Sequence, residues 1–318
     1  MKSSEPKPLQ NVAPSSGAIP ARICRSFSRG GRVLVAEGAG SEKNGGLPYD
    51  LGAFDLDGTV LRRDLTITQA TMEAFEALRE RGMKLVVATG RRFEGAYEHA
   101  EKLGFGGEDP VVCYGGSMIR RMNGETLLHR TIPRDVSLEV LEWAAERGLH
   151  ARVFTDGKII TSPDTSAALK HISYREPDVE IVESPALWLR EEAPEDPTKL
   201  VIVDHPHDVP RWLGEAKSAF AGRLHVTRSL PHYVEVGGLL GTKSEGLKFL
   251  CERWGIEPGR TLAFGDADND IDMLRFVGLG VAVGPMDEEV RAAADAVAPP
   301  VHEDGVARFV RELVGGEA

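Results

Sequence analysis

The sequence has few cysteines and no long apolar run. Its three cysteines, Cys24, Cys113 and Cys251, are an odd number without close spacing, so neither a disulfide framework nor a cysteine metal site is expected. We expect thiols in a reducing compartment, with Cys113 and Cys251 packed as small apolar side chains. No stretch of roughly 18 apolar residues occurs, which argues against a membrane-spanning helix. These absences predict a cytoplasmic protein with no membrane partner.

Positive charge is also scarce, because 38 Lys and Arg residues face 49 Asp and Glu residues, giving a formal net charge of -11. Nucleic acid is therefore not expected as a partner, since phosphate backbones are held mainly by Lys and Arg. An anionic substrate would need a local cation to overcome the overall field. The length of 318 residues, with 42% hydrophobic residues, favours about two domains with ordinary cores.

Residues 1–48 differ from the rest of the chain, because they are rich in Ser, Gly, Pro and Arg and poor in acids. A disordered tail, a transit peptide and a start codon placed too far upstream all agree with this composition. No continuous apolar segment of a secretory signal is present. We favour the plain tail.

Strands and helices alternate in residues 49–133. Apolar runs predict strands at 51–54, 84–89 and 110–114, separated by helices over 68–82 and 92–103. The same rhythm returns in residues 229–318, with helices at 243–254, 271–276, 288–294 and 306–314 and strands at 261–265 and 280–283. This alternation predicts a parallel sheet with right-handed crossovers.

Residues 134–228 lack this rhythm and mix helix and strand patterns without regular alternation. The preceding hairpin signal at Asn123-Gly124 marks the change of character. The order of the elements therefore predicts an α/β fold, with a doubly wound parallel-sheet core formed by residues 49–133 and 229–318. An α+β module is inserted between the two halves of this core.

Ligands of an open parallel sheet bind beyond the carboxyl ends of its strands, and the string DLDGT begins there with Asp55 and Asp57. Two carboxylates this close repel each other unless a cation lies between them. Mg²⁺ prefers such oxygen ligands, above all near phosphate. Gly58 permits the tight turn that follows.

Three further segments carry residues suited to binding an anion or a metal. Thr89 and Gly90 stand where a strand meets a helix, which is a ready anion site. Lys243 stands at a helix start, where an anion would relieve its conflict with the helix dipole. The string GDADND supplies a second acidic cluster for a metal. A calcium loop is the rival for this string, but Ile271 and Val277 replace its required Gly and Glu.

In chain order, DLDGT, Thr89-Gly90-Arg91, the helix-starting Lys243 and GDADND resemble the motifs of the haloacid dehalogenase superfamily of phosphatases. The position of the insertion is similar to that of the Cof-type subgroup, which carries a C2 (type IIB) cap on a Rossmann-like core. The resemblance implies that Asp55 attacks phosphorus and forms an aspartyl phosphate. Asp57 then acts as general acid and base.

The resemblance also implies the binding residues. It assigns phosphate binding to Leu56, Thr89, Gly90, Lys243 and Asn269, and Mg²⁺ binding to Asp55, Asp57 (through its backbone carbonyl), Asp266 and Asp270. A departure occurs after the third strand, where Tyr114 precedes Gly115-Gly116 instead of the usual Asn-Gly.

The implied activity is Mg²⁺-dependent hydrolysis of a small phosphorylated metabolite, with a sugar phosphate as the default substrate, by a monomer or homodimer. A phosphomutase uses the same core, but mutases of this superfamily typically carry a smaller cap near the first motif. A receiver-like or phosphate-binding protein without turnover is the alternative outside the enzymes. The length of the chain and the intact Asp57 argue against it.

Overall fold

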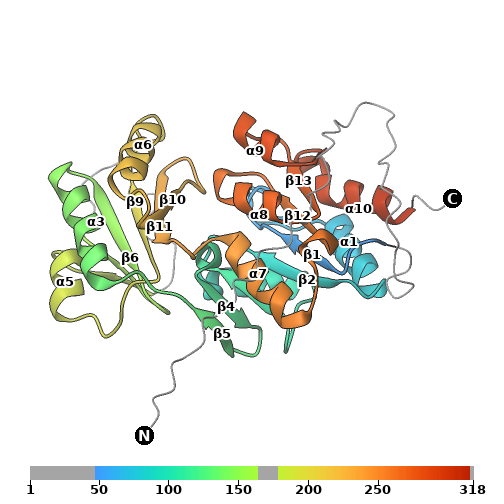
Figure 1. Cartoon of the computed structure of the whole chain (residues 1–318), viewed down its shortest axis with the longest axis horizontal. Helices are drawn as coiled ribbons and strands as arrows, with labels where there is room; N and C mark the ends of the chain where they lie inside the picture. Colours follow the sequence, from blue (N-terminus) through green and yellow to red (C-terminus); the bar gives the residue numbers. More distant parts are fainter. Residues whose placement is uncertain (1–46, 164–177, 316–318) are drawn as a thin grey trace, which may run out of the picture.

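The computed structural model describes residues 47–163 and 178–315. The segment expected as a tail lies almost wholly outside this part of the chain, as does Cys24. Cys113 and Cys251 are buried free thiols, as predicted. Figure 1 shows the described elements gathered around two sheets, one formed by the two ends of the chain and one by its middle.

The first sheet, which we call the core sheet, has eight strands in the described residues. Its strand order is β14 (Ala296–Ala298), β13 (Leu279–Val283), β12 (Thr261–Gly265), β1 (Leu51–Phe54), β2 (Lys84–Ala88), β3 (Pro110–Cys113), β4 (Met118–Arg121) and β5 (Thr126–His129). The strands from β14 to β3 are parallel, and β4 and β5 add an antiparallel hairpin at one edge.

The order of the strands reverses between β1 and β12. The chain runs outward from β1 through β2 to β3, and later from β12 through β13 to β14 in the opposite direction. β1 and β12 are therefore parallel neighbours although they are far apart in sequence. This is the doubly wound arrangement predicted from the sequence, and its reversal point is where ligands of such sheets bind.

Helices cover both faces of the core sheet. One layer consists of α1 (Gln69–Glu80), α2 (Phe93–Lys102) and α10 (Gly305–Gly315), and the other of α7 (Lys243–Trp254), α8 (Ile271–Phe276) and α9 (Glu288–Ala293). Within β1, Phe54 packs in the first layer's cluster and Ala53 in the second's. Because alternate residues of a strand face opposite sides, a strand covered twice reads as an unbroken apolar run.

The middle of the chain forms a second sheet with six strands in the described residues. Its order is β10 (Leu224–Thr227), β11 (Tyr233–Gly238), β9 (Lys199–Val203), β6 (His150–Phe154), β7 (Ile159–Thr161) and β8 (Val179–Ile181). Its helices α3 (Arg134–Glu146), α5 (Pro185–Glu191) and α6 (Val209–Ala219) pack on one face, away from the core sheet (Figure 1). We call the opposite face of this sheet the inner face.

The second sheet extends further along the chain than the sequence indicated. β11 pairs with both β10 and β9, which corrects the expected boundary at residue 228 to a point after Gly238. Val234 and Val236 pack toward the helices, while Glu235 lies on the inner face. The sequence did not predict this strand because its buried carboxylate and its glycine-rich end interrupt the alternation of apolar and polar residues.

The other elements that were not foreseen are β8, α5 and β14, which are too short to show a period. Among the helices of the described residues, none combines the length and the apolar character needed to cross a bilayer.

Candidate active site

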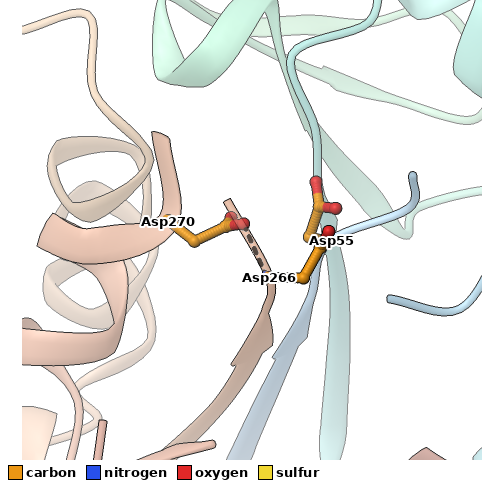
Figure 2. Close-up of side chains that lie close together, drawn as sticks. All are labelled: Asp55, Asp266 and Asp270. Atoms are coloured by element: carbon orange, nitrogen blue, oxygen red, sulfur yellow. Dashed lines mark hydrogen bonds between the residues drawn. The ribbon is translucent and has the colours of Figure 1, made fainter. Parts of the chain in front are cut away.

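The candidate site lies where β1 and β12 end side by side. Asp55 follows β1 and Asp266 follows β12, and the Asp55 amide donates to the Phe264 carbonyl at 3.0 Å. Asp270 reaches the same place from the short helical turn after β12. Each of these three aspartates offers a carboxylate oxygen within 4.8 Å of the others, and Figure 2 shows the side chains gathered beyond the strand ends.

Lys243 brings a positive charge into this cluster. It is the first residue of α7 and follows the N-cap residue Thr242. Its Nζ donates to Asp55 Oδ1 at 2.5 Å and to Asp270 Oδ1 at 2.6 Å, and its side chain is fully buried. The dipole conflict predicted for a lysine at a helix start is thus relieved by carboxylates of the protein itself.

Two of the remaining carboxylate oxygens are held by nearby donors. Asp270 Oδ2 accepts from the amides of Asp266 and Ala267 at 3.0 and 3.1 Å. Thr59 donates its hydroxyl to Asp266 Oδ1 at 2.7 Å. A Cβ atom on Gly58 would lie 2.2 Å from Asp266 Oδ2, and the residue has a φ of +86°. Only glycine fits this turn against the Asp266 carboxylate.

Burial and crowding favour the protonated forms of Asp55 and Asp266. Burial raises the pKa of Asp55 well above its usual value, against the lowering effect of Lys243. Burial and the neighbouring Asp270 raise the pKa of Asp266 to about 7. Burial alone would lower the pKa of Lys243, but Asp270 and Asp55 raise it. Two buried carboxylates and the half-buried Asp266 face one ammonium, so in their ionised forms they leave excess negative charge at the site.

This excess charge fits a divalent cation. The carboxylate donors are hard oxygen ligands, which Mg²⁺ and Ca²⁺ prefer over nitrogen or sulfur. Asp55, Asp266 and Asp270 could hold such an ion. The Asp57 side chain does not join this cluster within the described residues, so its contribution through the backbone carbonyl stays a prediction.

The Asp57 carboxylate instead faces Arg91. Arg91 donates from Nε to Asp57 Oδ2 at 2.7 Å and from Nη2 to Oδ1 at 2.6 Å, which is the strong two-pronged geometry of an arginine–carboxylate pair. Arg91 Nη1 also donates to the Gly95 carbonyl and lies 3.2 Å from His99 Nε2. The sequence showed Arg91 next to the anion site but gave no sign of this partner.

The residues expected to bind phosphate follow β1, β2 and β12, except Lys243, which begins α7. Thr89 is fully buried, and its Oγ1 accepts from the Arg91 amide at 3.2 Å. Within the described residues, neither the Leu56 nor the Gly90 amide takes part in a hydrogen bond, so both can receive an anion. A Cβ atom at Gly90 would lie 3.6 Å from Asn269 Nδ2. Gly90 and Asn269 are therefore neighbours, although their bonds to phosphate stay predictions.

Two further charged residues reach Gly90 from the second sheet. Lys199 of β9 donates from Nζ to the Gly90 carbonyl at 2.8 Å and lies 3.3 Å from Glu235 Oε1 on β11. The sequence analysis did not select either residue. The available signal was Lys199 at the start of β9 and Glu235 within β11, each on the side of its strand opposite the apolar residues that pack toward the helices.

The unusual Gly115-Gly116 pair packs against the start of α7. Gly116 has a φ of +111°, and a Cβ atom there would lie 1.9 Å from the Thr242 carbonyl oxygen. Thr242 immediately precedes the buried Lys243. The turn after β3 therefore sets how closely the lysine-bearing helix approaches the core sheet.

Gly116→Ala should destabilise the protein and impair the site together, because the methyl group would push Thr242 and Lys243 away from the carboxylates. We expect the free energy of unfolding to fall by about 2 to 4 kcal/mol, measured by urea denaturation. Gly214→Ala is the matched control, since Gly214 lies in α6 with open space around it. Equal stability of the two variants would contradict this role of Gly116.

Comparison with known proteins agrees with this arrangement. The sequence profile of the haloacid dehalogenase-like hydrolases matches residues 53–310. The chain is 28% identical to the 5-amino-6-(5-phospho-D-ribitylamino)uracil phosphatase YitU of Bacillus subtilis, over 83% of this chain and 97% of that protein. It is 30% identical to the HMP-PP phosphatase of Escherichia coli O157:H7, over 76% of this chain and 86% of that protein. A haloacid dehalogenase-like hydrolase from B. subtilis superimposes with a TM-score of 0.73 at 25% identity, covering 82% of this chain and 99% of that one.

Proposed function

The chain belongs to the haloacid dehalogenase-like hydrolases and is a phosphatase of this family, and from this premise we propose that it hydrolyses a small phosphorylated metabolite through an aspartyl phosphate. Mg²⁺ is the proposed cofactor and a sugar phosphate the proposed substrate. The relatives named as phosphatases of 5-amino-6-(5-phospho-D-ribitylamino)uracil and of HMP-PP support a small phosphorylated metabolite as the substrate. The cytoplasm as location and a monomer or homodimer as state remain predictions of the sequence.

The proposal is carried by one observation, the buried contact of Asp55 with Lys243 beside Asp266 and Asp270. Lys243 holds Asp55 Oδ1, which leaves Oδ2 as the atom that attacks phosphorus. When the bond to the leaving oxygen breaks, the phosphoryl group is transferred to Asp55. Water then hydrolyses the acyl phosphate and regenerates the carboxylate.

Asp57 is the proposed proton donor to the leaving oxygen and the later acceptor from water. In the present arrangement both of its oxygens accept hydrogen bonds from Arg91. Proton donation therefore requires one of these hydrogen bonds to break. Arg91 thus orients Asp57 and must release one of its oxygens during the catalytic cycle. A bound Mg²⁺ would neutralise negative charge between the carboxylates and the phosphate.

The second sheet with its helices, residues 134–238, is the proposed cap. Lys199 joins it directly to Gly90, so a phosphate bound at Gly90 would lie between the proposed cap and the core sheet. A cap in this position would exclude water during transfer to Asp55. A phosphomutase remains the alternative on the same core.

Removal of divalent cations tests the proposal. With p-nitrophenyl phosphate as substrate, we expect Mg²⁺-dependent release of p-nitrophenol and a loss of at least about hundredfold in kcat/KM when EDTA is added. Excess Mg²⁺ should restore the rate. Undiminished turnover in EDTA would contradict the metal assignment, and absence of turnover with Mg²⁺ would contradict hydrolysis itself.

A further inference from the structure

A buried ion pair on the inner face of the second sheet does not take part in the chemistry described above. Lys199 and Glu235 are each 6% exposed, and their side chains approach to 3.3 Å. Burying two charges is costly unless each finds partners. Lys199 has partners that compensate its burial, but only one of the two carboxylate oxygens of Glu235 has them.

Lys199 is held on both sides. Its ammonium donates to the Gly90 carbonyl at 2.8 Å and pairs with Glu235 Oε1. Because this cation is already bound to a carboxylate and a carbonyl, it has little remaining capacity for a second anionic group. Lys199 thus links β9 to Gly90 and fixes the position of Glu235.

Glu235 keeps one oxygen available. Its Oε1 accepts from Lys199 and from the Ser229 hydroxyl. In the part of the chain that the structure describes, no hydrogen bond ends on Oε2. Since a buried carboxylate oxygen normally finds a donor, this oxygen is suited to receive one from a ligand.

The available oxygen of Glu235 lies beside Gly90, where the phosphate is proposed to bind. A Cβ atom at Gly90 would be 3.7 Å from Glu235 Oε2 and 3.6 Å from Asn269 Nδ2. The same two side chains line a cavity between the second sheet and the core, together with Tyr114, His225 and Thr227. A phosphate bound at Gly90 would therefore lie next to this cavity, within reach of a leaving group that it carries.

We infer that this cavity is the leaving-group subsite and that Glu235 selects substrates whose leaving group is uncharged and carries hydroxyl groups. The inference rests on the proposed function and specifies its substrate. An alcohol hydroxyl donates to Glu235 Oε2. A second phosphate or carboxylate is repelled by Glu235, and an apolar leaving group leaves the buried oxygen unpaired.

The other polar groups of the cavity agree with this preference. Thr227 offers a hydroxyl that can donate or accept. Burial lowers the pKa of His225, so the imidazole supplies a neutral hydrogen-bonding group at neutral pH. The cavity therefore offers hydrogen-bonding groups, and Lys199, the cation among its lining residues, is already paired with Glu235.

A comparison of leaving groups tests the inference. The parent and Glu235→Gln are assayed with Mg²⁺ on p-nitrophenyl phosphate, glucose 6-phosphate, ribose 5-phosphate and fructose 1,6-bisphosphate. We expect the parent to prefer a sugar monophosphate. In Glu235→Gln, the ratio of kcat/KM for that sugar monophosphate to kcat/KM for p-nitrophenyl phosphate should fall about tenfold, and the bisphosphate should gain relative to the monophosphates.

Two further variants separate selection from folding. Glu235→Asp keeps the charge but withdraws it by one methylene, so it should lower the same ratio by a smaller factor. Glu139→Gln removes an exposed carboxylate of α3 that pairs with Arg223 at 2.8 Å, and it should leave the ratio unchanged. Thermal unfolding of each variant verifies that it is folded.

The outcomes distinguish the inference from the proposed function. If the parent hydrolyses p-nitrophenyl phosphate but neither sugar monophosphate, the inference alone is overturned. The same holds if Glu235→Gln loses kcat/KM equally on p-nitrophenyl phosphate and on the sugar monophosphate. A ratio unchanged in Glu235→Gln would do the same. Absence of any turnover by the parent would overturn the proposed function and the inference with it.

Discussion

Asp55→Asn should abolish phosphoester hydrolysis, lowering kcat by about a thousandfold or more. In the parent, Asp55 Oδ1 accepts a hydrogen bond from Lys243 Nζ at 2.5 Å. The amide oxygen of the asparagine can still accept this bond. However, an amide is too weak a nucleophile to attack phosphorus and form the acyl phosphate. The substitution also removes one of the three carboxylates that could hold the cation.

The measurement is kcat on p-nitrophenyl phosphate at saturating Mg²⁺, with circular dichroism and thermal unfolding to verify the fold. Asp135→Asn is the matched control, because Asp135 is an exposed carboxylate on α3 and its removal should leave kcat unaltered. An Asp55→Asn variant with the kcat of the parent would refute the role of Asp55 as nucleophile.

The doubly wound core could be predicted because its rules are local. Buried parallel strands read as apolar runs, helix starts carry capping residues such as Thr68, and parallel strands place their carboxyl ends at one edge. Asp55 and Asp266 could therefore be brought together from the sequence before any coordinates. Their shared position at the reversal of strand order follows from the pairing of β1 with β12.

The contacts made across the site could not be predicted in the same way. The pairing of Arg91 with Asp57 depends on the path of the turn that follows each of two strands. The burial of Glu235 depends on β9 lying beside β11 with the inner face toward the core. Such contacts arise from tertiary packing, and no local period in the sequence records them.

Lys243 shows how far charge reasoning alone can reach. A lysine at a helix start opposes the dipole, which predicts an anion near it. The structure supplies two carboxylates, and together with Asp266 they still outnumber the lysine. Lys243 therefore stabilises the carboxylate cluster and at the same time leaves it able to attract a divalent cation.

Lys243→Met should accordingly damage both stability and activity. Methionine fills a similar volume, but it leaves Asp55 and Asp270 buried without their shared cation. Breaking a buried pair in this way costs about 3 to 5 kcal/mol, which we expect as the loss in free energy of unfolding at pH 8 without divalent cations, measured by urea denaturation. Turnover of p-nitrophenyl phosphate should fall by at least about hundredfold.

The loss of stability should depend on pH with a definite sign. Burial already raises the pKa of Asp55, and removal of the ammonium raises it further. A carboxyl whose folded pKa lies above its unfolded value binds more protons when folded, so its folded form loses stability as the pH rises above the unfolded pKa. The difference between parent and variant should therefore be smaller at pH 5 than at pH 8. Lys248→Met removes an exposed ammonium from the same helix, and it should show neither the loss of stability nor its dependence on pH. If Lys243→Met were as stable as this control at pH 8, the buried ammonium would not hold the carboxylates together.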